Sequence, residues 1–249
     1  MSLTALLVVY LNWARRIIPP RLRNVVIEPS LTADWRWKRL RPDVQRFLEK
    51  VRAGEDLTPH HSLRVQHNGY TPAGMAAAKC DKWEDKDFLL IVMGYHHFHL
   101  GPESLHSHTE RTDDLLFAQV TRDKFFAIAL FDHSVFDKGA EMGAERERMW
   151  KLYHYRKSLG RAPGIYMATG PVATSGHSLD DVEMAQDYER IIRINDPKLE
   201  ELQTRSAFFP DLPHEVVKAQ KLSWLLYGQD LGLVDRTTET FFRLCDGPT

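Results

Sequence analysis

Cysteine is scarce in this chain of 249 residues. The two cysteines, Cys80 and Cys245, lie far apart in the sequence, and neither belongs to a CxxC pair. A disulfide framework and a cysteine-ligated zinc site are therefore not expected. A chain with so little cysteine suits a reducing compartment, and we expect a cytoplasmic protein.

Long hydrophobic runs are lacking as well. The apolar stretch Leu3–Leu11 is too short to span a bilayer, and Arg15 and Arg16 follow it, whereas a signal peptide carries its positive charge first. We expect a helix that packs its apolar side on the body of the protein, with no membrane contact. Internal repeats and low-complexity tracts are also absent from the sequence.

The sequence has almost no net charge, but its charges are unevenly distributed. The total is −1, whereas residues 1–52 hold eleven Lys and Arg against four acids. A basic arm of this kind suits a polyanion such as RNA, although it could equally dock on the acidic remainder of the chain or solvate a helix face. The candidate nucleic-acid-binding residues follow Trp35: Arg36, Lys38, Arg39 and Arg41.

Hydrophobic periodicity indicates an α+β fold. Helices are expected at Pro42–Val51, Glu141–Leu159, about 178–194 and Pro213–Tyr227, and strands at about Asp87–His99, Asp114–Val120, Phe125–Asp132, Leu231–Val234 and Thr240–Leu244. The short turn Thr121–Lys124 predicts an antiparallel hairpin. We expect an antiparallel sheet meander flanked by N-terminal helices, followed by a mostly helical C-terminal half. The division falls near residue 160 (1–160 and 161–249), unless the chain forms one continuous domain.

Histidine is abundant where these strands are expected. Half of the twelve histidines lie between Phe88 and His133. The first strand is apolar as far as Met93, and its end then carries His97 and His99 on one face. A buried strand that ends in imidazoles predicts polar chemistry at the rim of a sheet.

The order of helices followed by an antiparallel meander resembles the toxin ribonucleases of the RelE/ParE type. The resemblance covers about residues 40–135 and includes the strand that ends in histidine, the segment Arg111–Asp113 and the strand end Phe131-Asp132-His133. It implies a toxin–antitoxin ribonuclease that binds RNA on one sheet face and cleaves it without metal or other cofactor. The chain is longer and less basic than such toxins, and its C-terminal half has no counterpart in them.

The residue chemistry supports the same hypothesis, because histidine titrates near neutral pH. His97 or His99 would be the base, His133 the acid, and Arg111 the phosphate clamp. Two alternatives stay open. One is a non-catalytic regulator that binds nucleic acid or a protein partner. The other is a metalloenzyme, whose ligands would come from His97, His99, His106, His108, Asp113 and His133.

Overall fold

The computed structural model describes most of the chain: residues 1–61, 89–102, 112–137, 141–161, 170–201 and 221–249, with 206–207, 209–211, 213 and 217. It divides into two compact units. The histidine unit comprises Arg16–Leu179 together with Thr249, and the terminal unit combines Met1–Arg15 with Asp180–Pro248. The terminal unit therefore takes its parts from both ends of the sequence, whereas the sequence had suggested a division near residue 160.

The histidine unit is built on a four-stranded mixed sheet with the strand order β1-β4-β3-β2. Strand β3 pairs in antiparallel fashion with β2 on one side and with β4 on the other. The short edge strand β1 pairs in parallel with β4. The helical elements of this unit are α2, α3 and α5, with the 3₁₀ turns η1 and η2. Their bounds are β1 Asn24–Ile27, α2 Pro29–Thr32, α3 Trp37–Ala53, η1 Thr58–His60, β2 Tyr95–His99, β3 Asp114–Val120, β4 Lys124–Asp132, η2 His133–Phe136 and α5 Ala144–Ser158.

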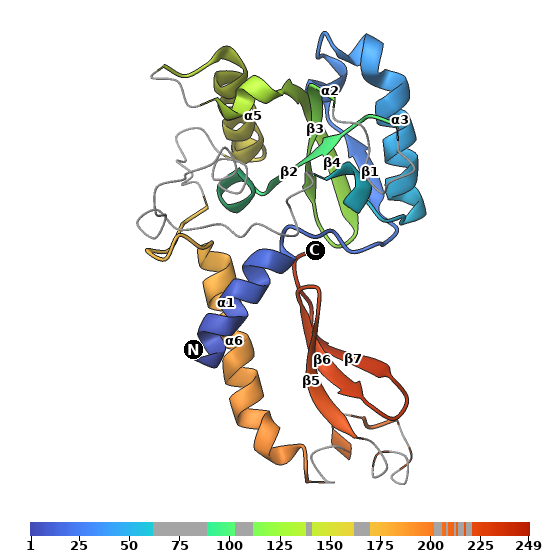
Figure 1. The fold of residues 1–249 in the computed structure, drawn as a ribbon, viewed down its shortest axis with the longest axis vertical. Helices are drawn as coiled ribbons and strands as arrows, with labels where there is room; N and C mark the ends of the chain where they lie inside the picture. Colours follow the sequence, from blue (N-terminus) through green and yellow to red (C-terminus); the bar gives the residue numbers. More distant parts are fainter. Residues whose placement is uncertain are drawn as a thin grey trace. The chain divides into compact units, whose positions relative to one another are not determined.

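The sheet lies between α3 and α5, so it has a hydrophobic core on each face (Figure 1). Strand periodicity sends alternate side chains to the two cores. Phe98 and Leu116 join Phe47 of α3 on one face, whereas Leu115 and Phe117 join Tyr153 of α5 on the other. All of these side chains are almost completely buried.

The predicted hairpin of β3 and β4 is confirmed. Its register pairs Val120 with Phe125 and Asp114 with Asp132, with an irregularity between Phe117 and Ala118. Both strands carry mainly apolar side chains on both faces, because a hydrophobic core covers each face of the sheet. Helix α3 is also confirmed and starts five residues before the predicted Pro42.

The predicted strand Asp87–His99 is only partly correct. Residues 89–93 are helical, and within the described residues of this segment, 89–99, the strand is limited to β2, Tyr95–His99. Leu89 to Met93 are all buried, so periodicity could not distinguish a helix from a covered strand. Gly94 ends the helical turn with a φ of 71°, a left-handed conformation that glycine adopts without strain, and its amide donates to the Leu90 carbonyl.

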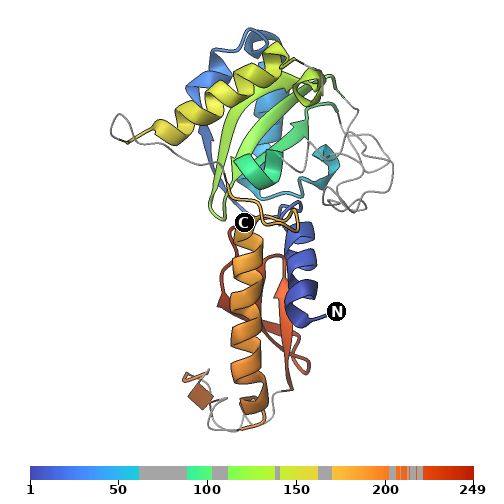
Figure 2. The ribbon, with the colours of Figure 1, turned by 90° about the vertical axis from the view of Figure 1, so that its left-hand side faces the viewer.

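The terminal unit holds a second sheet, a three-stranded antiparallel meander of order β5-β6-β7. The helices α1 and α6 pack against it through Leu7, Leu11, Tyr188 and Leu231 (Figure 2). The elements are α1 Leu3–Ala14, α6 Leu179–Asn195, η3 Asp196–Lys198, β5 Leu222–Tyr227, β6 Asp230–Asp235 and β7 Thr240–Cys245.

The two predicted C-terminal strands are confirmed, but the predicted helix Pro213–Tyr227 is wrong over its last six residues, which form β5. In that strand Leu222, Trp224 and Leu226 face the cores of the unit with period two. A two-residue turn at Gly228 connects it to β6. The fold class is α+β as expected, although its C-terminal part contains more strand than predicted.

Smaller differences concern α5, and other predictions fall on residues that the structure does not describe. The helical spacing of Met142, Met149 and Tyr153 predicts that all three are buried; in the structure Met149 and Tyr153 are buried in α5, whereas Met142 precedes the helix and is 58% exposed. The sequence also favours a strand at Ser62–Gln66 and a short helix that begins at Thr71-Pro72, but both segments lie outside the described residues. Within the described part of the chain, no helix is long and apolar enough to cross a membrane.

Candidate functional site

Two histidines meet at one end of the four-stranded sheet. His99 is the last residue of β2, and His133 is the first residue of η2, immediately after β4. Their ring centroids are 5.7 Å apart although the residues are separated by 34 positions in sequence. His99 is 2% exposed, whereas His133 is partly exposed. The pair therefore has one imidazole in the protein interior and one that solvent reaches.

The orientation of the His133 ring follows from one hydrogen bond. Its Nδ1 lies 3.0 Å from the carbonyl oxygen of Asp113, just before β3. A carbonyl only accepts, so Nδ1 carries the proton, and Nε2 of the neutral ring keeps its lone pair. This tautomer leaves Nε2 able to exchange a proton with a bound molecule.

The third predicted histidine on this face is His97, two residues before His99. It is partly buried, and its ring contacts Phe136 of η2 at a centroid distance of 5.3 Å. His133 contacts the same phenyl ring at 6.3 Å. The structure therefore brings His97, His99 and His133 to one side of the sheet, where Phe136 contacts His97 and His133 and the His133 ring lies beside His99.

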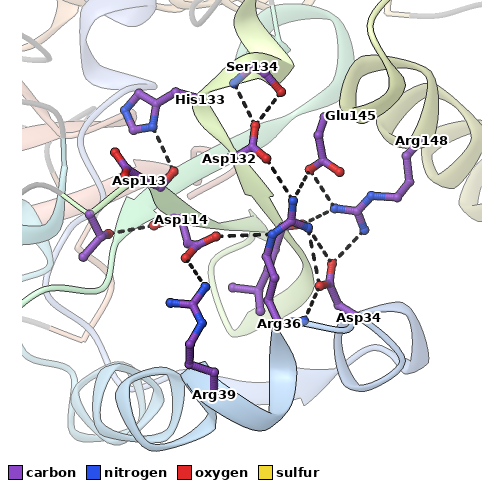
Figure 3. Close-up of polar contacts among 12 residues, drawn as sticks. Asp34, Arg36, Arg39, Asp113, Asp114, Asp132, His133, Ser134, Glu145 and Arg148 are labelled. Carbon is purple, nitrogen blue, oxygen red and sulfur yellow. Dashed lines mark hydrogen bonds and ion pairs between the residues drawn. The ribbon is translucent and has the colours of Figure 1, made fainter.

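A cluster of charged side chains borders this rim and was not anticipated from the sequence. The guanidinium of Arg36 is 4% exposed and contacts four carboxylates, one from the segment between α2 and α3 and one each from β3, β4 and α5 (Figure 3). Arg39 and Arg148 neutralise part of this charge. We call this set the Arg36 cluster; its members are Asp34, Arg36, Arg39, Asp114, Asp132, Glu145 and Arg148.

All three nitrogen atoms of the Arg36 guanidinium lie close to a carboxylate. Its Nε lies 3.3 Å from Asp114, its Nη2 lies 3.0 Å from Asp132 and 3.1 Å from Glu145, and its Nη1 lies 3.3 Å from Asp34. Asp114 and Asp132 are direct cross-strand partners in the register of β3 and β4. Two like charges in that position repel, and Arg36 converts the repulsion into two ion pairs.

Asp132 also caps the 3₁₀ turn η2 that follows it. One of its carboxylate oxygens accepts from Arg36, and the other accepts from the Ser134 amide at 2.9 Å and from the Ser134 hydroxyl. Burial acts to raise the pKa of Asp132, but the Ser134 hydrogen bonds and Arg36 outweigh it, so the pKa lies below its ordinary value. For Arg36, burial acts to lower the pKa, but Glu145 and Asp34 dominate and raise it. Both groups are therefore charged at neutral pH.

The four predicted nucleic-acid-binding residues have different environments. Arg36 is enclosed by carboxylates, and Arg39, although 60% exposed, pairs with Asp114 at 2.7 Å. Lys38 and Arg41 are exposed on α3, and neither forms an ion pair with another described residue. The basic arm thus contains cations that are paired internally and cations that remain available.

Some predicted residues cannot be placed. Arg111, the predicted phosphate clamp, lies outside the described residues, as do His106 and His108 of the metal alternative. Among the residues that the structure does describe, no three His, Cys, Asp or Glu side chains are arranged to hold a metal ion.

Sequence reasoning also missed two histidines beside the site. His60 donates from Nδ1 to the carbonyl of His99 at 2.8 Å, and His61 packs against His96 and Phe98 on the α3 side of the sheet. The Arg36 cluster was missed because its members are dispersed along the sequence, from Asp34 to Arg148. The only local signal was Asp132 before Ser134, a helix-capping pattern.

No protein-family model, curated protein or solved structure matches this chain. Its chemistry must therefore be inferred from the arrangement of its own side chains.

Proposed function

We propose that the protein is a metal-independent ribonuclease whose acid and base are the histidines at the rim of the four-stranded sheet. The observation that supports this proposal is the pair His99 and His133, with ring centroids 5.7 Å apart. Cleavage of RNA without metal needs two groups that transfer protons on opposite sides of one phosphate. Histidine suits both tasks at neutral pH.

The reaction would use the 2′-hydroxyl of RNA as nucleophile. One imidazole, His99 or His97, accepts its proton while the 2′-oxygen attacks phosphorus, and His133 donates a proton to the departing 5′-oxygen. His133 must be protonated for this step, and it then returns to the neutral tautomer in which Nδ1 donates to Asp113. The products are a 2′,3′-cyclic phosphate and a free 5′-hydroxyl, and DNA is not a substrate because it lacks the nucleophile. Arg111 remains the predicted partner of the phosphate oxygens.

The test is cleavage of a single-stranded RNA in the presence of EDTA. We expect the wild-type protein to release 2′,3′-cyclic phosphate ends, and we expect His99→Ala and His133→Ala each to lower the rate about 10²-fold, the usual scale for loss of a general acid or base. His154→Ala is the matched control, because His154 is exposed on α5 and stacks on Trp150, away from the rim.

Three outcomes would count against the proposal. Wild-type protein without activity on any RNA would reject a ribonuclease. Activity that EDTA abolishes would favour the metalloenzyme. Histidine variants as active as His154→Ala would place the chemistry elsewhere.

A second candidate function is binding of nucleic acid without cleavage. It is favoured by the exposed face of α3, where Lys38, Arg41 and Arg52 point to solvent and form no ion pair with other described residues. Cations without internal partners can neutralise phosphates at no cost in broken ion pairs. The toxin-like ribonuclease and the binding regulator share this surface, so the two functions differ only in what the histidines do.

A further inference from the structure

Two features determine the position of the His133 ring, namely the backbone that precedes it and the hydrogen bond that the ring donates. The Arg36 cluster makes contacts beside both of them. The first is the backbone: His133 follows Asp132, whose carboxylate accepts from Arg36 at 3.0 Å and from the Ser134 amide at 2.9 Å. These two contacts determine how the chain leaves β4 and enters η2, because Asp132 is the N-cap of that turn.

The second feature is the hydrogen bond that the ring donates. His133 donates to the carbonyl of Asp113, and the next residue, Asp114, pairs with Arg36 through Nε at 3.3 Å. The same guanidinium therefore holds the strand that carries the histidine and the strand that carries its acceptor. Figure 3 shows the two carboxylates on neighbouring strands with Arg36 bridging them.

We propose that Arg36 is a positioning residue for His133: it holds Asp132 and Asp114 together so that the imidazole keeps its Nδ1–H tautomer and its place beside His99. This inference rests on the proposed function for its catalytic meaning, although the positioning itself can be measured without activity. It also explains why arginine occupies a site enclosed by carboxylates, since a planar guanidinium spans several partners that one ammonium group cannot.

The test uses Arg36→Lys, which keeps the charge but cannot span the carboxylates, and Asp132→Asn. Asp132 is 38% exposed on its side chain, and the asparagine retains an oxygen for the Ser134 amide, so this variant is expected to fold. Arg148→Gln is the matched control: it removes an arginine of the same cluster that contacts Asp34 and Glu145, the Leu130 carbonyl and the Phe131 ring, but neither Asp114 nor Asp132.

The readout is the ¹⁵N spectrum of the His133 ring, assigned with a His133→Gln variant, together with hydrogen exchange at the Ser134 amide. In Arg36→Lys and Asp132→Asn we expect the Nδ1–H tautomer to lose its dominance and the amide to exchange at least about tenfold faster. We expect Arg148→Gln to change neither. If the protein cleaves RNA, kcat should fall about tenfold in the first two variants while KM stays within about twofold.

The outcomes separate the two proposals. A wild-type protein without ribonuclease activity rejects the proposed function, while the ring spectrum still decides whether Arg36 positions His133. An unchanged ring spectrum in both folded variants overturns the positioning role even if RNA is cleaved. Failure of both variants to fold would show that the cluster only maintains the fold, and the positioning role would be rejected.

Discussion

Individual histidines have opposite environments on the two faces of β2. His97 and His99 face the rim with His133, whereas His96 lies on the α3 side beside His61. Burial lowers the pKa of His61 to about 4, with the nearby His60 contributing and Asp56 opposing. Burial also lowers the pKa of His60, against the effect of its bond to the His99 carbonyl. These two histidines are neutral in the folded protein at physiological pH and contribute to packing.

The neutral state of His61 predicts that acid destabilises the protein. In the unfolded chain His61 takes up its proton near its ordinary pKa of 6.5, whereas the folded chain takes it up only at about 4. Stability is therefore highest above pH 6.5 and falls as the pH drops from 6.5 to 4. Over that range His61 alone accounts for about 3 kcal/mol. The measurement is the free energy of unfolding in urea between pH 7.5 and 4.5.

A phenylalanine at this position provides the comparison. His61→Phe keeps a ring against Phe98, which lies at a centroid distance of 5.0 Å, and it cannot titrate. We expect this variant to lose about 2–3 kcal/mol of the pH dependence, and His154→Ala to keep all of it. Equal pH dependence in wild type and His61→Phe would show that another group causes the acid effect.

At the scale of elements, α3 serves two purposes on two faces. Val44, Phe47, Leu48 and Val51 form its buried stripe, and they appear in the sequence with helical spacing. The exposed side of the helix carries Lys38, Arg41 and Arg52, which span about 21 Å at 1.5 Å per residue. The helix thus combines core packing with an exposed basic surface of a length that suits several phosphates.

This basic surface predicts how salt affects RNA binding. Each of Lys38→Gln, Arg41→Gln and Arg52→Gln should lower the slope of log K against log[salt] by about 0.7, the value for one neutralised phosphate of a single strand. Arg46→Gln is the control, because Arg46 already pairs with Asp43 at 3.1 Å and should change the slope less. The measurement is fluorescence anisotropy with a 2′-O-methyl RNA, which cannot be cleaved. A slope that none of the three variants alters would exclude α3 as the RNA-binding surface.

For the whole molecule, the most unexpected feature is that the terminal unit combines both ends of the chain. Arg15, the residue that follows α1, pairs with the fully buried Asp181 of α6 at 2.8 Å, and Tyr10 of α1 donates to the Leu226 carbonyl. These contacts join residues that are more than 160 positions apart. The first helix is therefore part of a core that the chain can complete only after its last strand is in place.

Leu11→Ala tests this organisation. Leu11 is fully buried with Ala185, Tyr188 and Leu231, so its truncation should cost about 2–5 kcal/mol. We expect faster hydrogen exchange in α6 and in β5 to β7, and unchanged exchange in β3 and β4. Leu48→Ala, an equally buried site in the histidine unit, should give the reverse pattern. Uniform loss of protection in both variants would show that the two units unfold as one.

Elements whose signals are local can be predicted from the amino-acid sequence. Strands β3 and β4 and their hairpin follow from covered-strand composition and a short turn, and α3 follows from its period and ends at Gly54, where φ is 73°. The histidines at the end of β2 were also visible, because alternation along a strand is a local property.

Which charges and imidazoles are neighbours depends on how distant elements pack, and local patterns do not predict it. Arg36 was expected to bind phosphate, and the fold instead encloses it with carboxylates drawn from positions 34, 114, 132 and 145. The helical turn at residues 89–93 was not predicted either, because burial on all sides removes the periodic signal. The packing of α1 against α6 likewise has no local signal in the sequence. Residues far apart in sequence meet through packing of whole elements, and no spacing within the chain encodes that contact directly.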